Sequence, residues 1–273
     1  MVVKIFLSLT PKELGTCSCV CRQWREVACS DAVWETQCRR RGWTSEHRAW
    51  SNELRTLYDR YRDLAGRRVF AWGSGEYGQI GLVDEKGREV TSRQPMEVKR
   101  LAGMGIVLVA CGSAHSSCLA ACGRIWTWGC GKYGRLGHGG EKNEPQPREV
   151  SSLPHRAFLV ACGGSHTVAS VYDQEHGRVE LYAWGSNMYG ECGTSDHLKN
   201  NDIPQYDESS TTRLFTRRKI NLVSAGSVHS AAICCDGEVY TFGRDCMPKL
   251  KGGGGRLGHG RHLSLHGIRD EVE

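Results

Sequence analysis

Apolar and polar residues alternate through most of the chain after residue 66, in short runs that end at glycine. Four runs carry valine, aromatic residues and threonine, as half-buried β-strands do; they cover residues 67–73, 123–129, 179–185 and 237–243. Another strand-like run precedes each of the last three, at residues 106–120, 158–171 and 220–234. Asp236-Gly237, between two apolar runs, is a strong hairpin signal. We therefore expect antiparallel sheets.

The Trp-Gly pairs that end these runs recur at a fixed interval. Trp72, Trp128 and Trp184 lie 56 residues apart, and Phe242 follows 58 residues later. Such a period indicates an internal repeat. Because one small sheet buries only one flank by itself, it needs neighbours on both sides, and radial stacking of four-stranded sheets is the usual solution. The pattern predicts a β-propeller with the tryptophans between adjacent sheets, and repeat units of about 68–123, 124–178, 179–237 and, in part, 238–273.

The stretch WGCGKYGRLGHG also has the glycine spacing of a dinucleotide-binding loop, at Gly129, Gly131 and Gly134. A cofactor loop has no reason to recur in register in three units, and no helix follows the glycines to face a phosphate. The motif is better explained as a turn. Position 131 aligns with Gly75 and Asn187, and these two residue types tolerate positive φ, so we expect a left-handed conformation there.

One histidine per unit, at 115, 166 and 229, raises the possibility of a zinc-binding ring of imidazoles. No carboxylate recurs beside them. Repeated packing and hydrogen bonding explain the pattern better, so we expect neither a metal nor a cofactor.

Before residue 44 the apolar positions recur at helical spacing. Thr10-Pro11 predicts a helix start, with Glu13 completing a capping box. The predicted apolar stripe comprises Leu14, Cys17, Val20, Cys21 and Trp24. We expect a helical module at 1–43, a connecting helix at 44–66 that ends at Gly66, and propeller repeats at 67–273. The predicted face of the connecting helix comprises Trp50, Leu54, Leu57, Tyr58, Tyr61 and Leu64. The fold class is therefore multidomain α+β.

The composition and the motifs argue against several classes of function. The net charge of +6 comes from scattered basic residues, which favours solvated surface over nucleic-acid binding. The 14 cysteines lack the CxxC pairs of zinc and redox sites, so we expect reduced thiols in a cytoplasmic or nuclear protein. No apolar run is long enough to span a membrane. No catalytic triad, nucleophile elbow or paired carboxylates are found, so we expect no enzyme.

The repeat resembles that of the regulator of chromosome condensation family. The first half of its motif appears as WGSGEYGQIG, WGCGKYGRLGHG and WGSNMYGECG, each followed by a proline segment at Pro95, at Pro145 and Pro147, or at Pro204. ACGSAHS, ACGGSHT and SAGSVHS supply the second half. The resemblance covers about residues 67–262 and implies a seven-bladed propeller, which needs about 390 residues. This chain offers three units and a partial fourth, interrupted by CMPKLKGGG between Gly243 and Gly255, so we expect a fragment or a faulty gene model.

The N-terminal segment resembles an F-box, the motif that docks onto the Skp-type adaptor of cullin-RING ubiquitin ligases. Thr10-Pro11, the run Val-Cys-Arg-x-Trp at 20–24 and Trp34 ten residues later carry the resemblance, together with Ile5, Leu7, Leu9 and Leu14. It implies an adaptor-binding set of Ile5, Leu9, Pro11, Leu14, Val20, Cys21, Trp24 and Trp34. The Leu-Pro element that opens the family motif is missing, which weakens adaptor binding unless residues precede Met1. The alternative is a plain helical cap on the propeller.

Two functions follow from these resemblances. The first is a non-catalytic substrate receptor that links an adaptor, and through it a cullin, to a protein target. Glycine-rich turns of a rigid scaffold commonly carry recognition, so the target-facing set is Tyr77, Lys132, Tyr133, Arg135 and Tyr189, although simple turn surface explains these residues equally well. The second is nucleotide exchange on a Ran-like GTPase, or chromatin binding. Neither requires a small-molecule substrate or a membrane.

Overall fold

The computed structural model describes two compact units. It covers residues 8–17, 22–43, 57–173, 175–193, 201–205, 220–235, 237–244 and 257, and the side chains at 15–17, 23–25, 58, 60 and 201–205 lie outside that description. The helical unit comprises Met1–Val69 with two short pieces, Leu101–Val107 and Ala120–Cys122. The sheet unit comprises Phe70–Arg100, Leu108–Leu119 and Gly123–Glu273.

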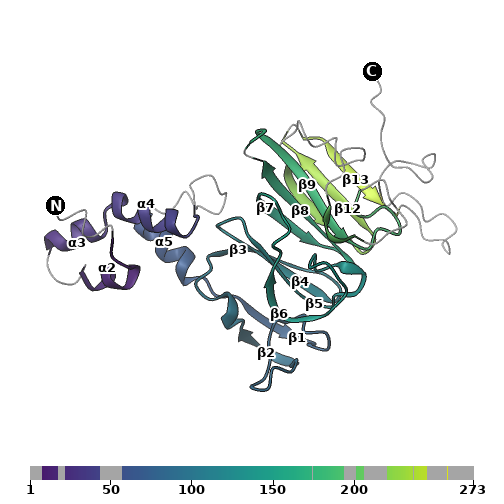
Figure 1. The fold of residues 1–273 in the computed structure, drawn as a ribbon, viewed down its shortest axis with the longest axis horizontal. Helices are drawn as coiled ribbons and strands as arrows, with labels where there is room; N and C mark the ends of the chain where they lie inside the picture. Colours follow the sequence, from purple (N-terminus) through teal and green to yellow (C-terminus); the bar gives the residue numbers. More distant parts are fainter. Residues whose placement is uncertain are drawn as a thin grey trace. The chain divides into compact units, whose positions relative to one another are not determined.

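The helical unit contains α2 (Pro11–Cys17), α3 (Arg22–Ala28), α4 (Asp31–Arg40) and α5 (Leu57–Gly66) (Figure 1). The predicted capping box is confirmed, because the Thr10 amide donates to Glu13 Oε2 at 2.7 Å and the Glu13 amide donates to Thr10 Oγ1 at 3.4 Å. Helix α5 ends at Gly66 as predicted. No helix in the described part of the chain combines the length and apolar character that a membrane crossing requires.

An aromatic cluster forms the core of the helical unit. The Trp34 ring lies 4.7 Å from Tyr61 and the Trp43 ring lies 5.2 Å from Tyr61, measured between centroids. The Trp34 indole donates to the carbonyl of Ala28. Leu64 is buried beside these rings, as its place on the predicted face requires. Trp50 and Leu54 of that face, and the side chain of Tyr58, lie outside the described residues.

In its described residues the sheet unit contains four antiparallel sheets, which we call blades 1 to 4 in chain order (Figure 1). Blade 1 is two-stranded, blades 2 and 3 are four-stranded with sequential strand order, and blade 4 has three described strands. In blades 2 to 4 the same residue pair stands in register: His115 with Gly129, His166 with Gly185, and His229 with Gly243. The repeated register and topology define a partial β-propeller. The strands are β1 (Phe70–Gly73), β2 (Ser92–Glu97), β3 (Ile106–Cys111), β4 (His115–Ala120), β5 (Ile125–Gly129), β6 (Glu144–Glu149), β7 (Arg156–Cys162), β8 (His166–Asp173), β9 (Arg178–Gly185), β10 (Asn201–Gln205), β11 (Ile220–Ala225), β12 (His229–Cys234) and β13 (Val239–Gly243).

The blades differ from the sequence-based expectation in two ways. Each of the three longer runs, at residues 106–120, 158–171 and 220–234, is a pair of strands. In the first run, the chain turns where the Gly112 amide donates to the carbonyl of His115 at 2.8 Å. The proline segments, to which the sequence pattern assigned no strand, form the outer strands β2, β6 and β10. Proline is tolerated there because the free side of an edge strand needs no donor. The four-stranded sheets are therefore offset from the sequence units.

Aromatic residues fill the space between successive blades, as predicted for Trp128 and Trp184. These residues and Phe242 are at most 3 % exposed. The Trp184 ring lies so close to Gly137 of blade 2 that a Cβ there would stand 2.9 Å from the indole nitrogen. Trp128 makes the equivalent approach to Gly81 of blade 1 and donates to the carbonyl of Gln79 at 3.0 Å.

The prediction is wrong for Trp72, which is 60 % exposed. No blade precedes blade 1 among the described residues, so nothing in the sheet unit covers its ring. Phe70 and Met96 are exposed for the same reason.

The insertion in the fourth unit leaves Leu257 with the contact that Leu136 makes in blade 2. Thr127 Oγ1 donates to the carbonyl of Leu136 at 2.6 Å in blade 2. In blade 4, Thr241 Oγ1 donates to the carbonyl of Leu257, also at 2.6 Å. Leu257 is buried. Leu257 is thus the structural counterpart of Leu136 in blade 2.

Candidate functional site

The repeated histidines connect neighbouring blades. His115 Nε2 lies 2.9 Å from Thr167 Oγ1, and Thr167 in turn donates to the carbonyl of Arg135 at 2.9 Å. His166 Nε2 lies 2.8 Å from Ser230 Oγ, which donates to the carbonyl of Glu191 at 2.8 Å. Each hydroxyl donates its only proton to a carbonyl, so toward the imidazole it can act only as an acceptor. Each imidazole must therefore donate from Nε2. The expectation of packing and hydrogen bonding is therefore confirmed for His115 and His166.

Burial keeps these imidazoles neutral. Desolvation, reinforced by the positive charge of Arg135, lowers the pKa of His115 to about 3. Desolvation, reinforced by His229 and Arg135, lowers the pKa of His166 to about 4. The Nδ1 atoms of His115 and His166 are buried without a hydrogen-bond partner in the described structure, so a proton placed there would be an unsatisfied charge.

The glycine three residues before each histidine is required by contact with the ring. A Cβ at Gly163 would stand 2.2 Å from Cε1 of His166, and one at Gly112 would stand 2.4 Å from Cε1 of His115. The glycine and the histidine of the second half-motif therefore form one packing unit.

The cysteines of the blades behave as buried apolar side chains. Cys118 and Cys162 are buried and form no disulfide. Desolvation raises the pKa of the Cys162 thiol to about 12, so the thiol stays protonated at neutral pH.

The glycine-rich turns present tyrosines at equivalent positions on three blades. Tyr77 and Tyr189 are 39 % and 41 % exposed, and Tyr133 is half-buried. Basic side chains accompany two of them: Lys132 Nζ lies 4.9 Å from the Tyr133 ring centroid, and the Arg244 guanidinium lies 4.2 Å from that of Tyr189. Four of the five predicted target-facing residues are therefore at least partly accessible.

Arg135 is the exception among the predicted target-facing residues. It is 5 % exposed, and its guanidinium donates to the carbonyl of Lys132 at 2.8 Å and to that of Gly164 in blade 3 at 3.2 Å. The prediction that Arg135 projects from the turn is wrong, because these carbonyls hold its side chain inside the unit.

The residue at this position also sets the conformation of the turn. Gln79 and Glu191 accept the amide hydrogen of the tyrosine two residues earlier, at 2.9 and 2.7 Å. A guanidinium cannot accept a hydrogen bond. In blade 2 the turn instead places Tyr133 at a φ of 65°, the single positive φ outside glycine in the described residues.

Position 131 does not have the left-handed conformation expected from the sequence. Gly131 has a φ of −88°. Glycine is required there because a Cβ would stand 2.0 Å from the carbonyl oxygen of Lys142. Besides Tyr133, the residues of this turn with positive φ include Gly129, Gly134 and Gly137.

The predicted adaptor-binding residues separate into three groups. Leu14 and Trp34 are 1 % and 3 % exposed and hold the helices together. Leu9 and Pro11 are half-buried, and the Leu9 carbonyl accepts a hydrogen bond from Gln37 Nε2 at 2.7 Å. Ile5, Val20, Cys21 and the side chain of Trp24 lie outside the described residues. Adaptor contact stays a prediction for this set, and the structure gives Leu14 and Trp34 a role in the core.

Repeated sheets with this register and these inter-blade contacts define a propeller-repeat protein joined to a helical module. The profile of the Regulator of chromosome condensation (RCC1) repeat matches residues 68–119, 122–170 and 180–233. The chain therefore belongs to the RCC1 repeat family. An F-box-like profile matches residues 1–40, so the helical module is F-box-like.

Curated relatives match the repeat region. "E3 ubiquitin-protein ligase HERC2" of Homo sapiens is 35% identical over 196 residues, which cover 70% of this chain and 4% of the relative. "Ultraviolet-B receptor UVR8" of Arabidopsis thaliana is 34% identical over 182 residues, which cover 66% of this chain and 38% of the relative. The chain thus spans a small part of the first and about two fifths of the second.

Solved structures agree on the fold. The crystal structure of human WBSCR16 has a TM-score of 0.57 and 23% identity, with 74% of this chain and 47% of that chain covered. The structure of Prp20p from Saccharomyces cerevisiae, described with its binding to Gsp1p and histones, has a TM-score of 0.53 and 22% identity, with coverage of 71% and 46%. At such identities the likeness concerns the fold alone.

Proposed function

We propose that the chain is a non-catalytic substrate receptor of a cullin-RING ubiquitin ligase. The F-box-like module would bind a Skp-type adaptor, and the exposed turns of the propeller would bind a protein target in the cytoplasm or nucleus. The observation that carries the proposal is the combination, in one chain, of an F-box-like match over residues 1–40 with RCC1-type repeats. This chain would hold the target close to the ligase, and such tethering raises the local concentration of target lysines near the enzyme.

The architecture of the helical unit supports a docking role. Its core is completed by its own aromatic residues, Trp34, Trp43 and Tyr61, so adaptor binding is not needed to bury them. Leu9 and Pro11, which are only half-buried, remain available at the start of α2. A docking surface of this kind fits the helix-in-groove mode, in which a few apolar side chains give most of the binding energy.

Adaptor capture tests the proposal. Full-length chain is co-expressed with a Skp-type adaptor, and the complex is quantified after affinity purification. We expect stoichiometric capture by the wild type and at least a tenfold loss in Trp24→Ala. Arg148→Ala is the matched control, because this residue forms an exposed ion pair with Glu144 in blade 2 and leaves the module unaltered. Far-UV circular dichroism shows whether each variant is folded.

The competing function gives a different outcome. Nucleotide exchange on a Ran-like GTPase rests on a likeness in fold to Prp20p at 22% identity. Failure of the adaptor to bind, together with faster GDP release from a Ran-like GTPase in the presence of this chain, would overturn the receptor proposal.

A further inference from the structure

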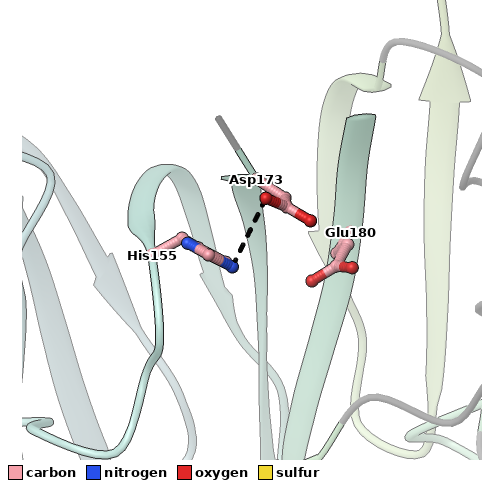
Figure 2. Close-up of side chains that lie close together, drawn as sticks. All are labelled: His155, Asp173 and Glu180. Carbon is pink, nitrogen blue, oxygen red and sulfur yellow. Dashed lines mark ion pairs between the residues drawn. The ribbon is translucent and has the colours of Figure 1, made fainter. Parts of the chain in front are cut away.

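A cluster of histidines and carboxylates lies at one end of blade 3, away from every residue assigned above. His155 precedes β7, Asp173 ends β8, His176 follows in the β8–β9 hairpin, and Glu180 lies in β9. Figure 2 shows His155, Asp173 and Glu180 converging from three adjacent segments. One ligand atom from each of these three residues lies within 4.8 Å of the others.

A second histidine, His176, lies beside this group and contacts one of its carboxylates. His155 Nε2 lies 3.6 Å from Asp173 Oδ1, and His176 Nδ1 lies 2.5 Å from Asp173 Oδ2. Asp173 is further oriented by the backbone amides of Glu175, at 2.9 Å, and of His176, at 3.3 Å. Both imidazoles are thus directed at a carboxylate that the backbone of the hairpin already fixes.

The two carboxylates are both buried. The side chains of Asp173 and Glu180 are 3 % and 4 % exposed, and burial of carboxylates is costly unless their charge is compensated. Arg178 supplies one positive charge: its Nη2 lies 2.7 Å from Glu180 Oε1 and its Nε lies 3.6 Å from Asp173 Oδ2. Among the ion pairs of the described residues, Arg178 is thus the one guanidinium that faces both carboxylates.

We propose that His155, Asp173 and Glu180 bind a divalent transition metal of the zinc class, with His176 holding Asp173 in place. One imidazole nitrogen and two carboxylate oxygens, with a water as the fourth ligand, suit Zn²⁺, whereas Ca²⁺ and Mg²⁺ take oxygen ligands. Tyr182 OH donates to Glu180 Oε2 at 3.0 Å and would hold that carboxylate in place, as partners of metal ligands commonly do. A bound dication would replace the positive charge of Arg178 beside the carboxylates. The Arg178 side chain is 30 % exposed, so its guanidinium can then turn toward solvent.

The position of the cluster gives the ion a structural role. The β8–β9 hairpin has longer strands, of eight residues each, than the β4–β5 and β12–β13 hairpins. A long hairpin is the part of a blade that most needs an added constraint. An ion held by His155, Asp173 and Glu180 joins the hairpin to the segment that enters β7, and so fixes one end of blade 3.

Zinc titration of the metal-free protein tests the inference. The full chain is stripped with a chelator, and binding of ZnCl₂ is measured by calorimetry together with the thermal midpoint. We expect one strongly bound zinc per chain, a higher midpoint, and at least tenfold weaker binding at this site in His155→Ala, His176→Ala and Glu180→Gln. Both histidines are partly exposed, so their variants are expected to fold.

A matched control exists one blade further on. Glu238 accepts a hydrogen bond from Tyr240 just as Glu180 does from Tyr182, but Glu238 is exposed. Glu238→Gln should leave zinc binding unchanged. Cobalt substitution separates this site from the cysteines, because nitrogen and oxygen ligands give no thiolate-to-cobalt charge-transfer bands. Equal zinc affinity of wild type and His155→Ala, or thiolate bands from the tightest cobalt site, would overturn the proposal.

Discussion

At the residue scale, each blade depends on a short chain of donors and acceptors that crosses to its neighbour. His115 donates to Thr167, and Thr167 donates to the carbonyl of Arg135. His166 and Ser230 repeat the arrangement one blade later. The sequence predicted that the histidines pack and form hydrogen bonds, but not their partners, because the two residues of each pair lie more than 50 positions apart.

These histidines make stability depend on pH. The folded pKa values of His115 and His166, about 3 and about 4, lie below the ordinary value of 6.5, so the unfolded chain binds more protons between these limits. Stability is therefore highest above pH 6.5 and falls toward pH 4, by up to about 1.4 kcal/mol per pH unit for each histidine. Urea denaturation across this range measures the slope.

The variant His115→Gln isolates the contribution of one imidazole. We expect it to be less stable than the wild type at pH 7 and to lose stability less steeply on acidification. Tyr172→Phe, at an exposed position of β8, is the control and should keep the wild-type slope. An unchanged slope in His115→Gln would show that other groups cause the pH dependence.

At the element scale, blades are joined by aromatic rings that pack on glycines of the preceding blade. The approach is so close that Gly137 has no room for a side chain beside Trp184. The strand pattern predicted these rings because alternation and the 56-residue period are local properties. It missed the outer strand of each blade, because proline in β2, β6 and β10 interrupts the β pattern that edge strands can tolerate.

Tryptophan substitutions distinguish an enclosed ring from an uncovered one. Trp184 is fully buried between blades 2 and 3, so Trp184→Ala should destabilise the sheet unit by about 3–5 kcal/mol. Trp72 has the same place in the repeat but is 60 % exposed, so Trp72→Ala should change stability by less than about 0.5 kcal/mol. Denaturation curves of the two variants give the comparison. A large loss in Trp72→Ala would mean that another surface covers this ring.

At the scale of the whole molecule, the repeat places a similar glycine-rich turn in each of blades 1 to 3. Tyr77, Tyr133 and Tyr189 occur once per blade, and rigid aromatic side chains of this kind are common in binding surfaces. The sequence found these tyrosines through their spacing. It misplaced Arg135, because only the fold brings the carbonyl of Gly164 within reach of the guanidinium.

The target-binding prediction follows from this series. Proteins captured by the wild-type chain are identified by mass spectrometry, and their affinity is measured for the variant Tyr77→Ala/Tyr189→Ala. We expect at least a tenfold loss with an unchanged thermal midpoint, because both side chains are exposed. Tyr172→Ala is the control, since Tyr172 is 38 % exposed but lies in β8 rather than in a turn. Equal affinity of the double variant and the control would remove these turns from the binding surface.

The sequence by itself determined what depends on short spacing: the repeat and its strands, the capping box of Thr10 and Glu13, and the separation of a helical module from the blades. Tertiary structure decided which residues meet across blades or across a hairpin. It paired His115 with Thr167, left Trp72 exposed, buried Arg135, and gathered His155, Asp173 and Glu180. The reason is physical: local spacing fixes which face of an element a side chain occupies, whereas burial and charge compensation depend on segments that only folding brings together.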